Sequence, residues 1–475
     1  MTPARRLLVL AAAIALAACA GAPKKPQPPA DLQQSWQDAP AGATTAALPP
    51  KAWWQDFHDP VLDRLISVAE ARNLDLRLAE GRLLEARALA RAARAELFPE
   101  PTGSVGADRS RTRTRSQGGA RTPSTENTFD LSVGATWEAD LFGRLASEAR
   151  AAGADVTASE ADRDAVRLTL LADVADAYIE LRLYQALADL ASKNADAQGG
   201  TVRITRARYE QGMSSRLDVE RTEAQLATTR ATLPQAREQA ETARYRLALL
   251  LAVSPDELTE TLPATGPLPQ ADALAVLAGP VQVVAQRPDV RAAESRLVAA
   301  AGRVTAAQAL RYPQISLSAM LGVESNHVSE LFSPGTRVWS VGAGLLAPLF
   351  DFGRISAAID AADARQQQAL AGYELAVRTA LQEAQTAIVL YTQGAIRQQE
   401  LTRAATAARR AADLAHRQYR EGTLSLLEVL DAERTLYDAE TESAQATADV
   451  SLRLVAVYRT MGVVPPHGAA PDRQE

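Results

Sequence analysis

Cysteine is nearly absent from this chain of 475 residues, which contains only Cys19, close to its N-terminus. A disulfide framework within the chain is excluded, because it needs a second cysteine. The four histidines are scattered, no two of them have metal-ligand spacing, and the sequence contains neither a Gly-x-Ser-x-Gly motif nor a phosphate-binding loop. Ser325 and His327 stand close together, but in a polar stretch typical of a solvated loop. We therefore expect no enzymatic activity, no metal and no cofactor beyond a covalent lipid.

Aromatic residues are also scarce, at 5% of the chain, whereas alanine, leucine, glutamate, glutamine and arginine dominate. Such a composition is typical of long helices with solvated faces. The net charge is −6 and no basic patch with interleaved aromatics is present, which disfavours nucleic acid as a partner. After the N-terminus, no stretch is apolar enough to predict a membrane-spanning helix.

The first residues have the layout of a secretory signal. Arg5 and Arg6 precede an apolar run over residues 7–18, which is too short for a stable membrane span. We predict that residues 1–18 are a signal peptide that is removed. Its removal takes away two arginines and no acid, so the net charge moves from −6 to −8.

The end of this segment, Leu-Ala-Ala-Cys, resembles a bacterial lipobox, in which the thiol of Cys19 is acylated. The alternative is a simple signal with an incidental cysteine. Residues 19–52 are rich in proline, alanine and glutamine and are typical of an extended tether. By resemblance to bacterial lipoproteins, Ala20 directs the protein to the outer membrane.

An internal repeat organises the rest of the chain. Residues 209–226 and 419–436, which are 210 apart, share seven identities in eighteen positions. Two further motifs recur in the same order. They are Phe-Gly-Arg at Phe142 and Phe352, also 210 apart, and an aromatic-proline pair ending at Pro99 and Pro313, 214 apart. The offsets indicate one unit written twice, with connections of different length.

Each copy contains a long stretch without proline, residues 145–211 and 355–421. As a continuous helix, either would be about 100 Å long, which is typical of a coiled coil or a scaffold. We predict a first repeat at 53–252, a linker at 253–286, a second repeat at 287–464 and a tail at 465–475.

Four short stretches instead alternate apolar and polar residues with the period of a β-strand. They lie at about 102–108, 128–138, 314–324 and 337–346. One wholly apolar face fits a membrane strand, and fits half of a soluble sandwich as well. The long helices and the lipid signal favour the membrane. Four strands are too few to close a barrel, and open edges cannot stay in lipid, so we expect the barrel to be shared between chains.

The order of strands, Phe-Gly-Arg, long helix and Tyr-x-x-Gly, together with the segment that begins at Trp53, resembles the outer membrane factors. These are the trimeric channel-tunnels of TolC type, and the OprM- and NodT-like lipoproteins are the most similar branch. The resemblance implies a mainly α fold with a small β part, in which three chains share a twelve-stranded barrel above a helical tube across the periplasm. It also implies that residues 216–252 stack end to end on 289–310, and the N-terminal helix on 426–462, and that the linker lies at the middle height of the molecule.

The implied function is a passive exit channel in the cell outer membrane for drugs or other small toxic molecules. The implied partners are two further copies of the chain, a periplasmic adaptor and an inner-membrane pump of the RND type. Three alternatives remain: the outer membrane component of type I protein secretion, a pore-less coiled-coil adaptor lipoprotein, and an envelope hydrolase, for which no catalytic constellation is found.

The second helix break, after Gly422, carries the candidate gate. Glu428 and Asp431 are three apart and share a helix face, so a symmetric trimer would gather six carboxylates if that face points inward. Alternatively, these acids only favour a helix N-terminus. The resemblance assigns gate roles to Tyr419, Glu428, Asp431 and Arg434. Some relatives have an arginine at the position of Leu424, so in this chain that tether is either missing or replaced by Arg434.

The first helix break, after Gly212, has Asp218 and Arg221 at the equivalent positions. An aspartate and an arginine three apart can pair with each other. We therefore expect Tyr209, Asp218 and Arg221 to brace the first tip, and the second tip to be the gate.

Overall fold

The computed structural model describes residues 36, 52–115, 121–271, 274 and 277–464. The predicted signal peptide, the lipidation site Cys19, most of the tether and the tail at 465–475 lie outside these ranges. The described chain forms two compact units. One comprises 82–160 and 292–373, and the other comprises 161–291 and 374–464 with the residues described before 82.

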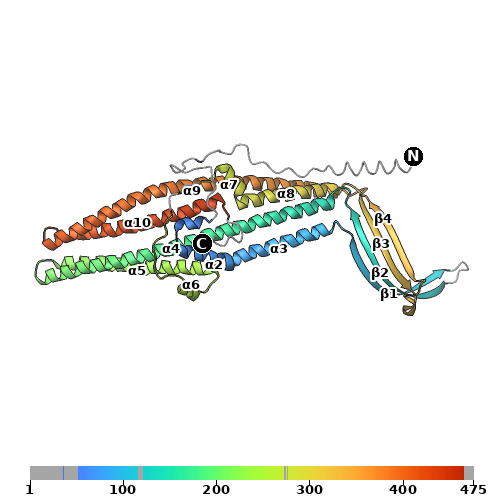
Figure 1. The fold of residues 1–475 in the computed structure, drawn as a ribbon, viewed down its shortest axis with the longest axis horizontal. Coiled ribbons are helices and arrows are strands. Elements are labelled where there is room, and N and C mark those ends of the chain that lie inside the picture. Colours follow the sequence, from blue (N-terminus) through green and yellow to red (C-terminus); the bar gives the residue numbers. More distant parts are fainter. Residues whose placement is uncertain (1–35, 37–51, 116–120, 272–273, 275–276, 465–475) are drawn as a thin grey trace, which may run out of the picture. The chain divides into compact units, whose positions relative to one another are not determined.

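The first unit contains one antiparallel sheet in the order β1-β2-β3-β4 (Figure 1). Its strands are β1 (Glu100–Arg115), β2 (Arg121–Ala139), β3 (Gln314–Ser325) and β4 (Arg337–Leu346), with the 3₁₀ turn η2 (Val328–Glu330) between the last two. The strands β1 and β2 run well beyond the predicted 102–108 and 128–138. Their pairing continues through polar Thr, Ser and Arg residues, which carry no apolar alternation but include good strand formers.

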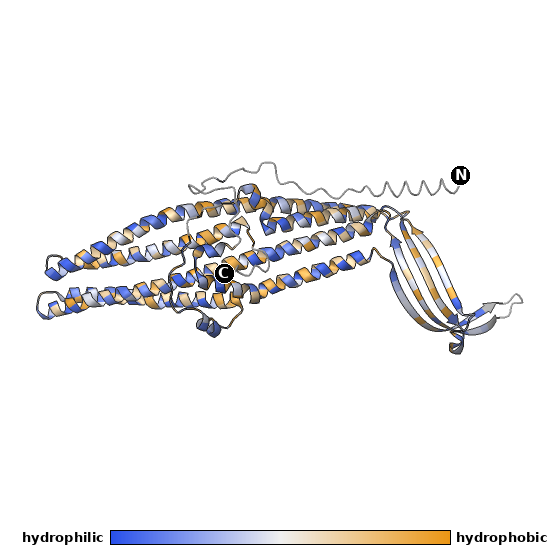
Figure 2. Cartoon of the chain, in the orientation of Figure 1, coloured by the Kyte–Doolittle hydropathy of each residue, from blue (hydrophilic) through white to orange (hydrophobic). Residues whose placement is uncertain are grey.

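One face of this sheet is apolar over the part in which all four strands are paired. Across it, Val105 lies opposite Leu131, and Val133, Leu321 and Trp339 follow one another from β2 to β4. Figure 2 shows the resulting alternation of hydrophobic and hydrophilic residues along the strands. These side chains are exposed in the single chain, Val105 at 82% and Trp339 at 75%. Among the described residues, the outer edges of β1 and β4 have no neighbouring strand.

Long helices continue from the sheet. The helix α4 (Arg144–Glu210) follows β2, and α9 (Arg354–Glu421) follows β4. The remaining helices are η1 (Trp53–Phe57), α2 (Pro60–Arg72), α3 (Leu74–Ala95), α5 (Arg216–Leu251), α6 (Pro255–Thr261), α7 (Pro280–Gln286), α8 (Pro288–Ala309) and α10 (Leu426–Met461). Within its described residues, the predicted linker 253–286 thus contains two short helices. Of the helices described, none combines the length and apolarity needed to cross a membrane.

The second unit is built around a core of buried side chains from its N-terminal segment and from the long helices. Trp53 is fully buried and stacks on Tyr458, with ring centroids 5.4 Å apart. The Tyr178 hydroxyl donates to Asp59 Oδ2 at 2.7 Å, and Trp36 Nε1 donates to the Ala278 carbonyl at 2.7 Å. The first repeat therefore packs against the second through contacts distant in sequence.

The short helices do not meet in the expected pairs. Asn73, between α2 and α3, donates through Nδ2 to the Leu250 carbonyl at 2.8 Å, near the end of α5. Arg287, between α7 and α8, donates through Nη1 to the Thr460 carbonyl at 3.3 Å, near the end of α10. The helix α3 therefore begins where α5 ends, and α8 begins where α10 ends. The expected stacking of 216–252 on 289–310 is wrong, because each half-length helix meets its partner from the same repeat.

Candidate functional site

The two helix breaks have the same backbone geometry. Gly212 and Gly422 adopt φ values of +76° and +77°, which favour glycine. Each glycine N–H donates to a carbonyl three residues back, Tyr209 at 2.9 Å and Tyr419 at 3.1 Å. The next N–H reaches the carbonyl five residues back, so both breaks are Schellman motifs. The glycines therefore reverse the chain and form two helical hairpins, α4–α5 and α9–α10.

Each hairpin then starts its second helix with a capping box. Glu428 Oε2 accepts from the Ser425 hydroxyl at 2.8 Å and from the Ser425 N–H at 3.0 Å. Asp218 Oδ2 accepts from Ser215 in the same way, at 2.8 and 3.0 Å. The serine donors hold the pKa of both carboxyls below the usual range. In the single chain, these acids are charged and stabilise their own helix N-termini.

The other charged residues at the tips are paired differently from expectation. Arg434 Nη2 donates to Asp431 Oδ1 at 2.9 Å on the exposed surface of α10. Arg221 forms no direct pair with Asp218, whose Oδ2 instead accepts from Ser214 and Ser215. Arg221 acts on Asp218 only through its charge, which lowers the pKa further. The predicted Asp218–Arg221 ion pair is replaced by the cap.

The two tips are joined by a contact that sequence reasoning missed. Tyr419 is buried, and the guanidinium of Arg208 lies over its ring, 4.2 Å from the centroid. Arg208 Nη2 also donates to the Tyr419 carbonyl at 2.7 Å. Tyr209, the repeat counterpart of Tyr419, is exposed. The hairpin α4–α5 thus holds the hairpin α9–α10 through an arginine on one and a tyrosine on the other.

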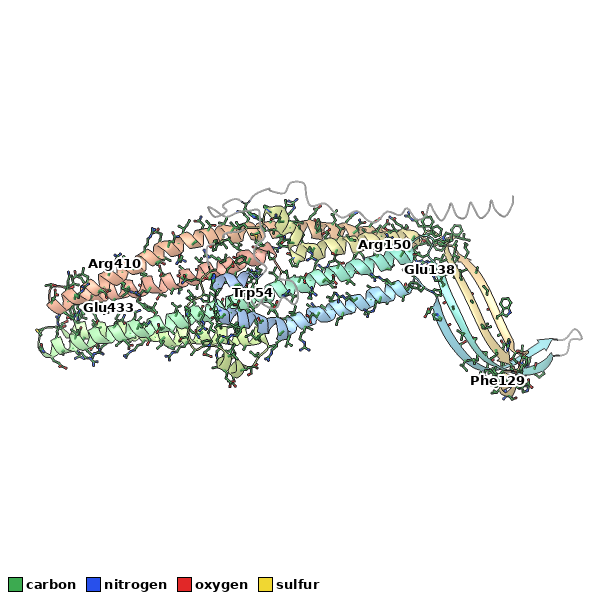
Figure 3. All side chains as sticks on the ribbon, viewed as in Figure 1. Trp54, Phe129, Glu138, Arg150, Arg410 and Glu433 are labelled. Atoms are coloured by element: carbon green, nitrogen blue, oxygen red, sulfur yellow. The ribbon has the colours of Figure 1, made fainter. Side chains whose placement is uncertain are left out.

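A second contact joins the hairpins further from the tips. Glu433, which is labelled in Figure 3, is buried on α10, and its Oε1 accepts from the Thr201 hydroxyl of α4 at 2.6 Å. His416 Nε2 of α9 lies 3.2 Å from the same oxygen, and Oε2 has no hydrogen-bond partner. The repeat carries a signal for this site. Glu223 and Arg206, at the same positions in the first copy, form an exposed ion pair, with Arg206 Nε 2.8 Å from Glu223 Oε1.

Burial raises the pKa of Glu433, although the hydrogen bond from Thr201 and the charge of His416 act in the opposite direction. A carboxyl with a raised pKa favours the folded state only below its unfolded pKa, and this contribution is lost as pH rises through the folded pKa. Glu433→Gln removes the charge, so we expect it to raise the melting temperature at pH 8. The gain should shrink towards pH 5.

Thermal melts of the full protein between pH 5 and 8 measure this effect. The matched control is Glu223→Gln, the exposed counterpart in the first hairpin, which should change the melting temperature little at any pH. A Glu433→Gln protein that melts below the wild type at pH 8 contradicts the argument.

Two halves of the chain, residues 65–253 and 279–463, match the sequence pattern of one family, described as outer membrane efflux protein. The chain belongs to the outer membrane efflux protein family. The two matched segments correspond to the two copies of the repeat, and each ends after a hairpin. The predicted family and fold class are confirmed.

Similar proteins and structures agree with this assignment. The pyoverdine export outer membrane protein OpmQ of Pseudomonas putida is 32% identical over 474 residues, covering 97% of this chain and 98% of OpmQ. The antibiotic efflux pump outer membrane protein ArpC of P. putida is 32% identical, covering 96% of this chain and 95% of ArpC. The outer-membrane channel OprN matches with a TM-score of 0.87 at 35% identity, covering 94% of this chain and 99% of that chain. The open state of the MtrE outer membrane channel of Neisseria gonorrhoeae matches with a TM-score of 0.82 at 29% identity, covering 94% of this chain and 99% of that chain.

As an outer membrane efflux protein, the chain is an outer membrane channel of an efflux pump and not an enzyme. The described residues hold no group of three or more His, Cys, Asp or Glu side chains that could bind a metal ion. A channel needs a passage for its cargo and a part of the chain that closes this passage. The hairpin tips, with their glycine breaks and charged first turns, are the candidate site of closure.

Proposed function

We propose that three copies of this chain form the passive exit duct of a tripartite efflux system. The observation that carries the proposal is the four-stranded sheet, with one apolar face and two edges that no other described strand of the chain pairs with. In lipid, the amide groups of those edges need partners. Four strands are fewer than the eight of the smallest membrane barrels, whereas three copies supply twelve. A lipid on Cys19 would anchor the duct to the outer membrane.

The partners proposed are a periplasmic adaptor and an inner-membrane pump of the RND type, which would supply the energy. The proposed cargo is small molecules, including drugs and other toxic compounds. Similar proteins are described as exporting pyoverdine, toluene and antibiotics, and all of these are small. Their names lend no support to the alternative of type I protein secretion.

The gate is proposed at the tip of α9–α10, formed by Tyr419, Glu428, Asp431 and Arg434. The hairpin α4–α5 would brace it. Two observations support this division of roles. The second tip carries a carboxylate, Asp431, that takes no part in a cap. The second tip is also bound by the other hairpin, because Arg208 of α4 donates to the Tyr419 carbonyl.

Recording in planar lipid bilayers tests the duct and its gate together. We expect the wild type to form cation-selective pores, because two carboxylates, Glu428 and Asp431, stand against one Arg434 at the gate of each chain. Asp431→Ala should reduce the preference for potassium over chloride about fivefold, the effect of losing roughly 1 kcal/mol of attraction. The control is Glu220→Ala, an exposed acid of the first hairpin that pairs with Arg216. Absence of any pore from the wild type would refute the duct, and unchanged selectivity in Asp431→Ala would refute the gate.

A further inference from the structure

Phe98 and Phe352, at the base of the sheet, have no ring partner in the described part of the chain, and the same holds for Phe350 beside them. Phe352, from the second Phe-Gly-Arg motif, is fully exposed at 102%, and Phe98, just before β1, is exposed at 68%. Phe352 lines a hollow of about 620 Å³ together with Leu346 and Tyr312. Leu346, Phe350 and Phe352 gather around this one hollow, and a contiguous exposed apolar patch is a candidate contact surface.

Their counterparts in the repeat do have partners. Phe142, from the first Phe-Gly-Arg motif, stacks on Tyr312, which occupies the position of Phe98 in the second copy. The ring centroids are 4.6 Å apart and the planes are 11° from parallel. Phe142 follows β2 and Tyr312 precedes β3, and these two strands are neighbours. The aromatic pair thus marks the junction where one repeat pairs with the next.

The registers show how closely the two repeats agree. Thr102 lies opposite Gly134 in the first hairpin. Shifted by the sequence offsets of 214 and 210, these positions become Ser316 and Gly344, which lie opposite each other in the second hairpin. The two β-hairpins therefore have the same register, although their connecting loops differ. If the pairing between β4 of one copy and β1 of the next obeys the same offsets, its register is defined as well.

The same two offsets map the paired positions of β2 and β3 onto positions of β4 and β1, the two edge strands. Ala135 of β2 lies opposite Ala319 of β3. The shifted positions are Leu345 of β4 and Val105 of β1, which lie on opposite edges of the same sheet. Both belong to the apolar face and are exposed, Leu345 at 68% and Val105 at 82%. They can meet only between two copies of the chain.

Resting on the trimer proposed above, we propose that Phe352 of one copy stacks on Phe98 of the next, with Leu345 opposite Val105 of that copy. The aromatic pair fixes the register between chains. A slip by one residue would turn the apolar face inward, and a slip by two would keep the faces but separate the rings. The junction between copies thus repeats the junction within each copy.

Cross-linking in the outer membrane tests the contact. The full chain with Phe98→Cys and Phe352→Cys, treated with a short bismaleimide, should yield bands of two and three chains on a denaturing gel. Each single substitution is the control that shows whether Cys19 itself takes part in a cross-link. Phe142→Cys with Tyr312→Cys is the matched control, because that link forms within a chain and leaves a single-chain band. Phe98→Cys with Phe332→Cys, an exposed residue of the loop between β3 and β4, should form no link.

Disulfide formation tests the register. Leu345→Cys with Val105→Cys should link copies on oxidation, whereas Ala343→Cys with Val105→Cys, on the same face but two residues away, should link at least tenfold less. Equal yields from the two pairs overturn the register. Variants are compared only after bilayer recording shows that they form pores.

The outcomes separate this inference from the duct itself. A protein that is trimeric by native mass measurement and conducts, but links neither pair, overturns the inference and leaves the duct standing. A protein that is neither trimeric nor conducting removes both. Phe352→Ala provides a second measure, because it should lower the temperature at which the trimer dissociates in detergent. Phe352→Tyr should restore that temperature, and Phe332→Ala should leave it unchanged.

Discussion

Arg208→Ala is expected to open the duct. In the single chain, the Arg208 side chain covers the ring of Tyr419 and donates to its carbonyl, and it thereby ties the second tip to the first. A cation–π contact combined with a charged hydrogen bond is worth about 2 kcal/mol in a partly buried setting. Its loss should shift the balance between closed and open tips by roughly 30-fold per chain. Bilayer recording should show pores that are open for most of the time.

The matched control for this prediction is a substitution of Arg206, about half a helical turn from Arg208 on α4. Arg206→Ala removes an arginine of the same helix that pairs with Glu223 inside the first hairpin and does not reach the second. It should leave conductance unchanged. Arg208→Lys keeps the charge but loses the planar contact, so an intermediate result is expected. If Arg208→Ala and Arg206→Ala conduct alike, the contact does not hold the tips closed.

Leu321→Arg is expected to remove the protein from the outer membrane. Leu321 lies on the apolar face of β3, between Val133 and Trp339 on the neighbouring strands, and is 66% exposed. An arginine facing lipid near the middle of a bilayer costs about 2–4 kcal/mol, and a trimer would carry three of them. We expect at least a tenfold loss of trimer from the membrane fraction, measured by immunoblotting after density separation.

The neighbouring residue provides the control. Met320 lies on the opposite face of the same strand, and Met320→Arg places a charge of similar length on the side that would face the lumen. This variant should assemble at close to the wild-type level and change only conductance. Similar losses from both substitutions would show that the two faces do not differ in environment.

The fold class could be predicted because its signals are local and repeated. The long helices are bounded by Phe-Gly-Arg at one end and by glycine at the other, and both boundaries are set by backbone geometry within a few residues. The ends of β1 and β2 were harder to predict, because their outer halves are polar and carry no alternation. The pairing of the half-length helices was predicted wrongly. The similarity of the two copies makes α5 and α10 equivalent in sequence, and only the contacts of Asn73 and Arg287 distinguish the arrangements.

In the candidate site, too, the local features could be predicted from the sequence and the long-range contacts could not. The glycine breaks and the acids of the first turns follow from spacing, and the alternative interpretation of Glu428 as a helix-capping acid describes its contacts in the single chain. The bonds from Arg208 to Tyr419 and from Thr201 to Glu433 join residues more than 200 apart in sequence. No local pattern marks such a pair. The signal available in sequence was a difference between the copies, since His416 stands where the first copy has Arg206.

The unpaired edges of β1 and β4 have a consequence for assembly kinetics. An open pair of copies would contain one sheet junction and leave two edges bare, whereas arrival of the third copy would form two junctions in a single step. Ring closure of this kind is strongly cooperative, because the last addition gains twice the contact for one loss of translational freedom. Partial rings should be short-lived, and the yield of complete channels should depend steeply on the rate at which chains reach the membrane.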